Sequence, residues 1–240
     1  SSQVGCPLNC SFCATGKSGF TRNLSAGEIV GQFLAMEKRI GENINNVVYM
    51  GMGEPFLNSA EVFKSIRILN SSKMRSLGAR HITTSTSGVV PGILELADFP
   101  IPVRLSVSLH APNDVLRSKI MPVNRKHSLG SLIDALKAYK DKTGERITIE
   151  YVMLQKVNDE PEHAYEMAAI LSGLGVYVNL IPYNPIALLQ PGEQGFQRST
   201  TERIKEFAAI LAKLGIENEI RKEKGTDIDA ACGQLRAQSL

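Results

Sequence analysis

Three cysteines near the start of the chain have the spacing of a metal or cluster site. Cys6, Cys10 and Cys13 lie within one eight-residue stretch, while Cys232 stands more than two hundred residues away. Three thiolates on a short loop can ligate three irons of a 4Fe-4S cluster and leave the fourth iron open. A closed zinc site needs four protein ligands, usually as two pairs, and no second pair follows here. The spacing therefore favours an iron–sulfur cluster over a zinc knuckle or unrelated free thiols, and Phe12 could shield it.

The overall composition is that of one globular catalytic unit in a reducing compartment. The chain has 240 residues, 43% of them hydrophobic, which is enough for one large core. Four cysteines in this length do not resemble a secreted disulfide framework. No window approaches the ~18–20 apolar residues of a membrane span, and the opening SSQVGC lacks the features of a signal peptide. We expect a cytoplasmic protein that does not contact membranes.

The charge balance does not identify the kind of binding partner. A net charge of +3 is far below the basic excess of a dedicated nucleic-acid binder. Aromatic residues make up 6% of the chain and tryptophan is absent, so no residue can be named for base stacking. The residues that could contact phosphates, or could equally form solvated faces, are Lys17, Arg22, Arg125, Lys126, Arg221, Lys222 and Lys224.

The elements that must position these groups alternate between strands and helices. Strands are predicted over 47–51, 81–85, 104–109, 147–153, 176–181 and, more weakly, 216–221. Helices are predicted over 25–40, 128–140, 161–171 and 199–214, the first with Ser25 as N-cap and Glu28 completing a capping box. Alternation every ~30–40 residues indicates an α/β fold with a mainly parallel sheet. We predict a partial (β/α)6-type barrel, with a doubly wound sheet as the alternative.

Polar segments follow four of the predicted strands, at 51–55, 85–88, 110–113 and 182–185. The carboxyl ends of parallel strands carry the active sites of such folds, so these segments should converge on one mouth. This position favours a functional His110 over a core histidine. The other histidines, His81, His127 and His163, show no ligand spacing and are interpreted as structural.

The spacing Cys-x3-Cys-aromatic-Cys resembles the signature of the radical SAM superfamily. This resemblance implies that the open iron binds the amine and carboxylate of S-adenosylmethionine, and that one electron from the cluster cleaves it to methionine and a 5′-deoxyadenosyl radical. The segment GMGEP at 51–55 stands where that superfamily carries a GGE-type motif for the methionine amine. A carboxylate beside backbone groups freed by glycine suits an ammonium.

Nine motifs narrow the resemblance to one family. They are SSQVGC at the start, GFTRNL at 19–24, GMGEPFLN at 51–58, STSGVVP at 85–91, SVSLHAPND at 106–114, MPVNRK at 121–126, EYVMLQKVND at 150–159, NLIPYNP at 179–185 and DIDAACGQL at 227–235. Together they resemble the RlmN-type adenine carbon-2 methyltransferases of 23S rRNA and tRNA, whose nearest sisters are the Cfr-type carbon-8 enzymes. The resemblance runs from residue 1 to 236, and the proline of GMGEP favours the carbon-2 family.

The resemblance implies a role for each matching position. Cys6, Cys10 and Cys13 would ligate the cluster. The residues that would bind S-adenosylmethionine are Gly53, Glu54, Ser85, Ser108, Leu109, His110 and Asn184. Cys232 matches the family's S-methylated cysteine, although by itself it could be a small buried hydrophobe.

The role of Cys232 is chemically reasonable. Carbon 2 of adenine is electrophilic, and the methyl of a sulfonium is electrophilic as well, so direct transfer between them is unfavourable. A cysteine thiolate can instead take the methyl from one S-adenosylmethionine. A radical made from a second S-adenosylmethionine then removes a hydrogen from that methyl, and the resulting methylene radical adds to the ring. The family therefore uses two cofactor molecules per turnover.

The resemblance also implies partners and domain organisation. The substrates would be 23S rRNA and tRNA, the electron donor a flavodoxin with its reductase, and the protein a monomer. Residues 1–240 would form one radical SAM catalytic domain, with a cluster loop over 5–14 and a methyl-carrier loop over 225–236. The family's N-terminal RNA-binding domain, resolving cysteine and base glutamate all lie upstream of SSQVGC.

The start of the chain has neither an initiator Met nor, we expect, room for a strand before Cys6. We therefore interpret it as a fragment that loads S-adenosylmethionine but stalls as an RNA adduct. Three alternatives stay open: the carbon-8 enzyme, a radical SAM activase that takes hydrogen from a partner protein's glycine, and an iron–sulfur RNA-binding module without turnover. Cys232 argues against the activase, which needs no methyl carrier.

Overall fold

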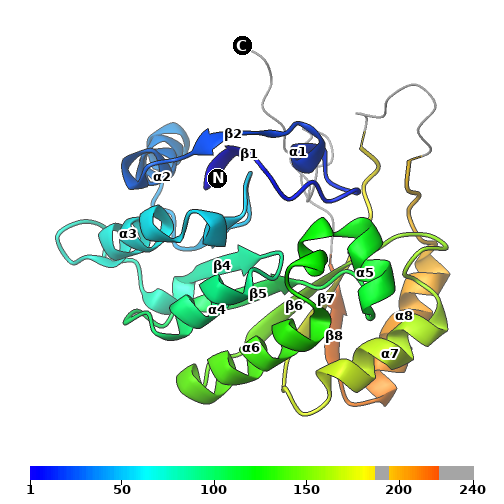
Figure 1. The fold of residues 1–240 in the computed structure, drawn as a ribbon. Coiled ribbons are helices and arrows are strands. Elements are labelled where there is room, and N and C mark those ends of the chain that lie inside the picture. The colour runs from blue at the N-terminus through cyan, green and yellow to red at the C-terminus, as the bar shows by residue number, and fades with distance from the viewer. Residues whose placement is uncertain (187–194, 222–240) are drawn as a thin grey trace.

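The computed structural model describes residues 1–186 and 195–221, in which six parallel strands form one sheet in chain order. These strands are β3 (Val47–Tyr49), β4 (Ile82–Thr86), β5 (Arg104–Ser108), β6 (Ile147–Met153), β7 (Tyr177–Pro182) and β8 (Glu217–Ile220), each hydrogen-bonded to the next. The sheet twists strongly from β4 to β8 (Figure 1). Every predicted strand is present, which confirms the α/β fold with a parallel sheet.

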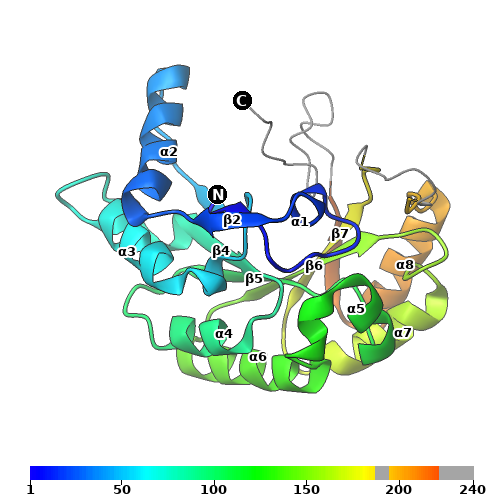
Figure 2. The same cartoon turned by 45° about the horizontal axis from the view of Figure 1, so that its top comes forward.

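Helices alternate with the strands along the chain. They are α1 (Ala14–Lys17), α2 (Ala26–Ile40), α3 (Ser59–Asn70), α4 (Val90–Ala97), α5 (Asp114–Ile120), α6 (Leu129–Thr143), α7 (Pro161–Leu171) and α8 (Thr201–Lys213). Helix α4 packs beside α6, and α7 packs beside α8. These four helices lie on the same side of the sheet (Figures 1 and 2), as in a partial barrel and unlike a doubly wound sheet. None of the helices in the described ranges is long and apolar enough to cross a bilayer.

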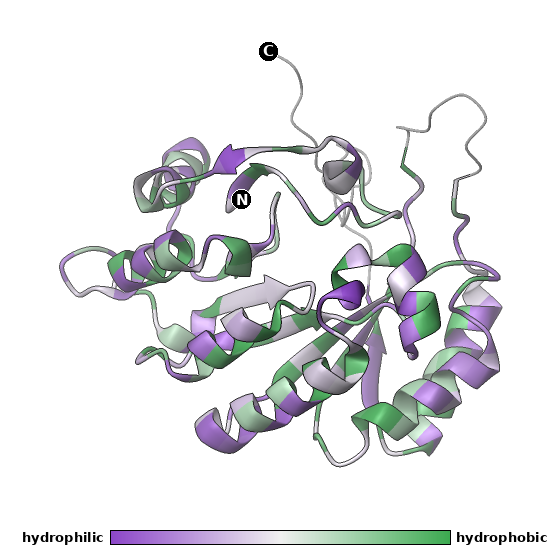
Figure 3. Cartoon of the chain, in the orientation of Figure 1, coloured by the Kyte–Doolittle hydropathy of each residue, from purple (hydrophilic) through white to green (hydrophobic). Residues whose placement is uncertain are grey.

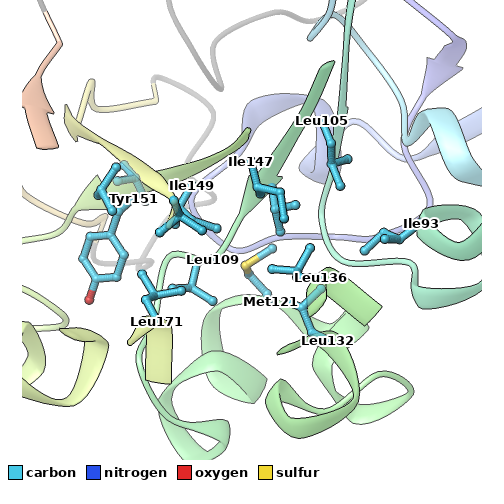
Figure 4. Close-up of a cluster of buried hydrophobic side chains, with 14 of the residues drawn as sticks. Ile93, Leu105, Leu109, Met121, Leu132, Leu136, Ile147, Ile149, Tyr151 and Leu171 are labelled. Carbon is cyan, nitrogen blue, oxygen red and sulfur yellow. The ribbon is translucent and has the colours of Figure 1, made fainter. Parts of the chain in front are cut away.

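The core lies between the sheet and these outer helices. Ile147, Ile149 and Tyr151 of β6 are fully buried and point to one side, toward residues such as Leu136 of α6 and Leu171 of α7 (Figure 4). Hydrophobic residues line the inner faces of the helices, and hydrophilic residues their outer faces (Figure 3). Successive side chains of a strand point to opposite faces, so the residues between these apolar ones point into the barrel interior.

Local capping explains where the first long helix begins and ends. The Ser25 hydroxyl accepts from the Glu28 backbone N–H at 3.3 Å, and the Glu28 carboxylate accepts from the Ser25 N–H at 2.9 Å. This capping box confirms the predicted start of α2. The helix ends at Gly41, whose φ of 71° lies in the left-handed region that favours glycine.

A two-stranded hairpin frames the cysteine loop. Strand β1 (Gln3–Gly5) pairs antiparallel with β2 (Phe20–Asn23), and the chain between them carries all three clustered cysteines. The expectation that no strand fits before Cys6 is therefore wrong, because three residues suffice when the partner strand follows the loop. Gly5 has φ 78°, and a Cβ there would lie 2.0 Å from the Gly19 carbonyl oxygen. Only glycine allows this close crossing.

Candidate functional site

A cavity of about 680 Å³ opens at the carboxyl edge of the sheet, beneath the cysteine loop. Its wall draws on the cysteine loop and on the chain at or just after each of the six strands. The predicted site residues that line it are Cys6, Cys10, Cys13, Gly53, Glu54, Ser85, Ser108, His110 and Asn184. The polar segments after the strands thus converge on one mouth, as predicted.

The three cysteines form one side of this cavity. The Cys6 backbone N–H donates to the Gly19 carbonyl oxygen at 2.8 Å, which closes the base of the loop, and α1 begins directly after Cys13. Burial raises the pKa of the Cys6 thiol to about 11 and raises that of Cys10 further. Each thiol would therefore ionise only in the presence of a strong counter-charge such as a metal centre.

The arrangement of the thiols fits a cluster better than a single ion. Within residues 1–186 and 195–221, no three His, Cys, Asp or Glu side chains converge on the position of one metal ion. A 4Fe-4S cluster has no such requirement, because each cysteine binds a separate iron. Three soft thiolates on one wall of a cavity are the donor set that such a cluster takes.

Glu54, which also lines the cavity, is held rigidly. Its carboxylate accepts the backbone N–H of Ser87 at 2.7 Å and that of Phe56 at 3.1 Å, and the side chain is only 2% exposed. Burial raises the pKa of this carboxyl, although the bonds from Ser87, Thr86 and Phe56 partly offset the effect. A bound ammonium would compensate for the missing solvent around the carboxylate.

The residue before Glu54 must be glycine for the hairpin to dock. Gly53 has φ 97°, and a Cβ there would lie 2.5 Å from Cβ of Gln3 in β1. The Gln3 side-chain oxygen in turn accepts the Glu54 backbone N–H at 2.8 Å. The hairpin that carries the cysteines is thus fixed directly against the GMGEP segment.

The three residues at the end of β5 do not point the same way. Ser108 and His110 line the cavity, whereas Leu109 is fully buried in the hydrophobic core. Leu105 and Val107 are also in the core, so alternation along the strand places Leu109 there with them. The Leu109 N–H donates to the Glu150 carbonyl oxygen at 3.0 Å. The structure therefore does not bring the Leu109 side chain to the site.

A polar row inside the barrel joins the predicted Ser108 to three residues that were not predicted. Ser108, Glu150, Asn179 and Glu219 are paired in register across β5, β6, β7 and β8. One oxygen of the buried Glu150 carboxylate accepts from Ser106 and from Asn179, each at 3.0 Å. The available signal was a glutamate in the middle of an otherwise apolar strand, ITIEYVM.

The second Glu150 oxygen, Oε2, has no hydrogen-bond donor among the described residues. Its nearest cation is Arg221, whose Nη1 lies 3.8 Å away, and Glu150, Glu219 and Arg221 all line the cavity. The interior therefore contains an incompletely satisfied carboxylate, which suits a ligand with hydrogen-bond donors. The predicted methyl-carrier residue Cys232 and the segment 225–236 lie outside the described residues.

The known proteins to which this chain is similar are consistent with the site described above. The radical SAM superfamily profile matches residues 1–168. A probable dual-specificity RNA methyltransferase RlmN from Thermotoga neapolitana is 54% identical over 236 residues, which cover 98% of this chain and 67% of that protein. A protein of the same name from Fervidobacterium nodosum is 52% identical over 240 residues, which cover 100% of this chain and 68% of the relative.

Solved structures show the same relationship. A radical SAM methyltransferase from Sphaerobacter thermophilus superposes with a TM-score of 0.94 at 49% identity, covering 99% of this chain and 69% of that one. A domain of pyruvate-formate lyase-activating enzyme from Bacteroides vulgatus has a TM-score of 0.55 at 17% identity, over 75% of this chain and 100% of that one. At this identity the second likeness concerns the fold alone.

Proposed function

Because this chain belongs to the radical SAM superfamily and, within it, to the RlmN family of RNA methyltransferases, we propose that it methylates carbon 2 of an adenine in 23S rRNA and in tRNA. The observation that carries this proposal is the convergence of three cysteines and six of the seven expected cofactor residues on one cavity. The whole of 1–240 acts as one catalytic domain in the reducing cytoplasm, as a monomer.

Different side chains of the cavity hold the cluster and the methionine portion of S-adenosylmethionine. Cys6, Cys10 and Cys13 hold a 4Fe-4S cluster, which when bound supplies the electron for reductive cleavage of S-adenosylmethionine. Glu54 accepts the ammonium of the methionine portion, since its buried carboxylate is fixed by the N–H groups of Ser87 and Phe56. A flavodoxin-type donor delivers the electron.

The remaining cofactor residues bind the adenosine portion. Ser85, Ser108 and Asn184 offer hydroxyl and amide groups along the mouth of the cavity. His110 offers a ring N–H, because its other nitrogen already accepts the Val152 backbone N–H at 3.0 Å. Together these groups orient the nucleoside and exclude water from it.

Cys232 serves as the methyl carrier. Its thiolate attacks the methyl carbon of one S-adenosylmethionine, so that a bond forms between this carbon and the cysteine sulfur, the methyl–sulfonium bond breaks and S-adenosylhomocysteine leaves. Cleavage of a second S-adenosylmethionine provides the radical that removes one hydrogen from this methyl. The resulting methylene radical then adds to carbon 2 of the adenine, and the new carbon–carbon bond leaves the RNA joined to Cys232. One cofactor molecule thus supplies the methyl and a second supplies the radical.

The experiment that tests this proposal is peptide mass spectrometry around Cys232 on protein produced with an intact cluster. The expected result is one added methyl on Cys232, together with 5′-deoxyadenosine when the protein is given S-adenosylmethionine and a reductant. An unmodified Cys232 in protein that still cleaves the cofactor would point to another radical SAM reaction. A protein that binds RNA without cleaving the cofactor would be a binding module.

The carbon of the adenine ring that receives the methyl is determined separately, by identifying the modified nucleoside. Deuterated-methyl S-adenosylmethionine labels any methyl that reaches the RNA, and mass spectrometry of the digested RNA distinguishes 2-methyladenosine from 8-methyladenosine. We expect the carbon-2 product, either free or as an adduct with Cys232. The carbon-8 product would assign the chain to the chemistry of the sister family instead.

A further inference from the structure

Arg117 is a fully buried cation just below the cofactor site. It lies on α5, and its guanidinium donates from every nitrogen. Nε donates to the Leu109 carbonyl oxygen at 3.0 Å, and Nη2 donates to those of Ser87 at 2.7 Å and Ser108 at 3.1 Å. Nη1 donates to the side-chain oxygen of Asn124 at 2.9 Å. Every one of these acceptors is uncharged.

The positive charge of Arg117 therefore lacks a direct counter-charge within the described ranges, where no carboxylate lies within ion-pair distance of it. Asp114 reaches it only through Asn124, whose amide donates to Asp114 at 2.8 Å. The same Asp114 oxygen also accepts the Leu129 backbone N–H at 2.8 Å. Burial lowers the pKa of Arg117 to about 10, so the group stays protonated at neutral pH. A buried charge without an anionic partner is costly.

Helix α5, which carries Arg117, abuts the cysteine loop. The Ser11 N–H and hydroxyl both donate to the Ile120 carbonyl oxygen, at 3.0 and 3.3 Å. Ile120 lies one helical turn beyond Arg117, and Ser11 lies directly after Cys10. Arg117 and Cys10 lie close enough to interact electrostatically. A negative centre held by the cysteines would therefore interact with this buried guanidinium.

We propose that Arg117 is the buried counter-charge of the cluster held by Cys6, Cys10 and Cys13, and that it makes this cluster easier to reduce. The inference rests on the proposed function, because it assumes an iron–sulfur cluster at these cysteines. Three thiolates give such a cluster a net negative charge, which increases when it accepts an electron. A nearby cation in a low-dielectric surrounding stabilises the reduced form more than the oxidised form.

The test is the midpoint potential of the reconstituted cluster, followed by electron paramagnetic resonance during a redox titration. Arg117→Gln removes the charge, so we expect its potential to be more negative than that of the wild-type protein. Arg117→Lys keeps the charge but loses the planar fork of donors, so its potential should stay near the wild-type value. The measured midpoint potential does not depend on methyl transfer.

A second variant moves the potential in the opposite direction without altering Arg117. Asp114→Asn removes the nearest carboxylate and keeps an oxygen that can accept from Leu129 and Asn124, so we expect a more positive potential. Thermal unfolding shows whether each variant is folded. If Arg117→Gln does not fold, Asp114→Asn still tests the inference. Equal potentials in wild-type and Arg117→Gln proteins, or an unchanged potential in Asp114→Asn, would overturn the inference.

The same experiment separates this inference from the function on which it rests. Wild-type protein that assembles no four-iron cluster would overturn the proposed function. A cluster that assembles normally, with potentials indifferent to charge at positions 114 and 117, would leave the proposed function intact. Equal shifts in Arg117→Lys and Arg117→Gln would overturn the charge argument and show that Arg117 acts only by positioning its acceptors.

Discussion

The backbone N–H of Val152 donates to Nδ1 of His110 at 3.0 Å, linking β6 to the chain just after β5. The bond occupies one ring nitrogen as an acceptor, and burial lowers the pKa of His110 to about 3, so the ring is neutral and carries its proton on Nε2. Asn158 holds the His110 carbonyl oxygen at 2.8 Å, which supports a left-handed backbone with φ 55°. His110 thus presents a fixed N–H donor to the cavity.

This relationship predicts a specific pH dependence of stability. Between pH 6.5 and about 3 the unfolded chain binds a proton at His110 and the folded chain does not, so acid favours unfolding. The contribution is complete above pH 6.5 and falls by at most about 1.4 kcal/mol per pH unit below it. His110→Asn, which tolerates the left-handed backbone, should lose this component.

The measurement is urea unfolding of metal-free wild-type and His110→Asn proteins between pH 7.5 and 4.5. The wild-type free energy of unfolding should fall more steeply than that of the variant as the pH decreases. Parallel curves would contradict a neutral, buried His110.

Replacement of Glu150 should separate ligand binding from folding. Glu150→Gln keeps an oxygen for Ser106 and Asn179 and removes a buried charge, so the free energy of unfolding should stay the same or rise. S-adenosylmethionine should bind about tenfold more weakly or worse, because a charged acceptor in the cavity is lost. Calorimetric titration measures the affinity.

The matched control is Glu217→Gln on β8. Glu217 is 73% exposed at its side chain, pairs with Arg146 and does not line the cavity, so its replacement should leave the affinity unchanged. Equal affinities of the Glu150 and Glu217 variants would show that Glu150 does not contact the cofactor.

A side chain at Gly53 should lower the free energy of unfolding more than one at Gly41, which also has a positive φ. Gly53→Ala adds a contact with Gln3 to the left-handed strain, for a combined cost of roughly 2–5 kcal/mol. Gly41→Ala has φ 71° and no atom within 4 Å of the new Cβ, so only strain of roughly 1–2 kcal/mol remains.

Urea unfolding and cofactor titration of the two glycine variants test this difference. Gly53→Ala should also weaken S-adenosylmethionine binding, because the hairpin and the GMGEP segment move apart. If both variants behaved alike, the close approach of Gly53 to Gln3 would not matter for the site.

Much of this fold follows from short-range patterns, and the exceptions have physical causes. The capping box at Ser25 and the apolar strands were predictable because their signals are local. Helices α1, α3, α4 and α5 were not predicted: α1 has four residues, α5 has seven, and α4 contains Pro91 and Gly92. Gly92 is needed there because a Cβ would lie 2.3 Å from Phe56, a long-range contact that no local pattern reveals.

The site was predictable where chemistry and spacing coincide, and less so where packing decides. Glu54 and His110 line the cavity as their positions after predicted strands indicate, and the cysteines line it as their own spacing indicates. Leu109 was assigned together with its neighbours, although the alternation of β5 already places it in the core. Glu150 and Arg117 depend on partners more than twenty residues away, or on burial that only the folded chain defines.

The most direct test of the proposed radical SAM activity is the formation of 5′-deoxyadenosine from S-adenosylmethionine by the anaerobically reconstituted protein in the presence of a strong reductant. We expect this product with wild-type and Cys232→Ala proteins, and its loss with Cys10→Ala. Absence of the product from wild-type protein that carries a full complement of iron and sulfide would contradict the proposed activity.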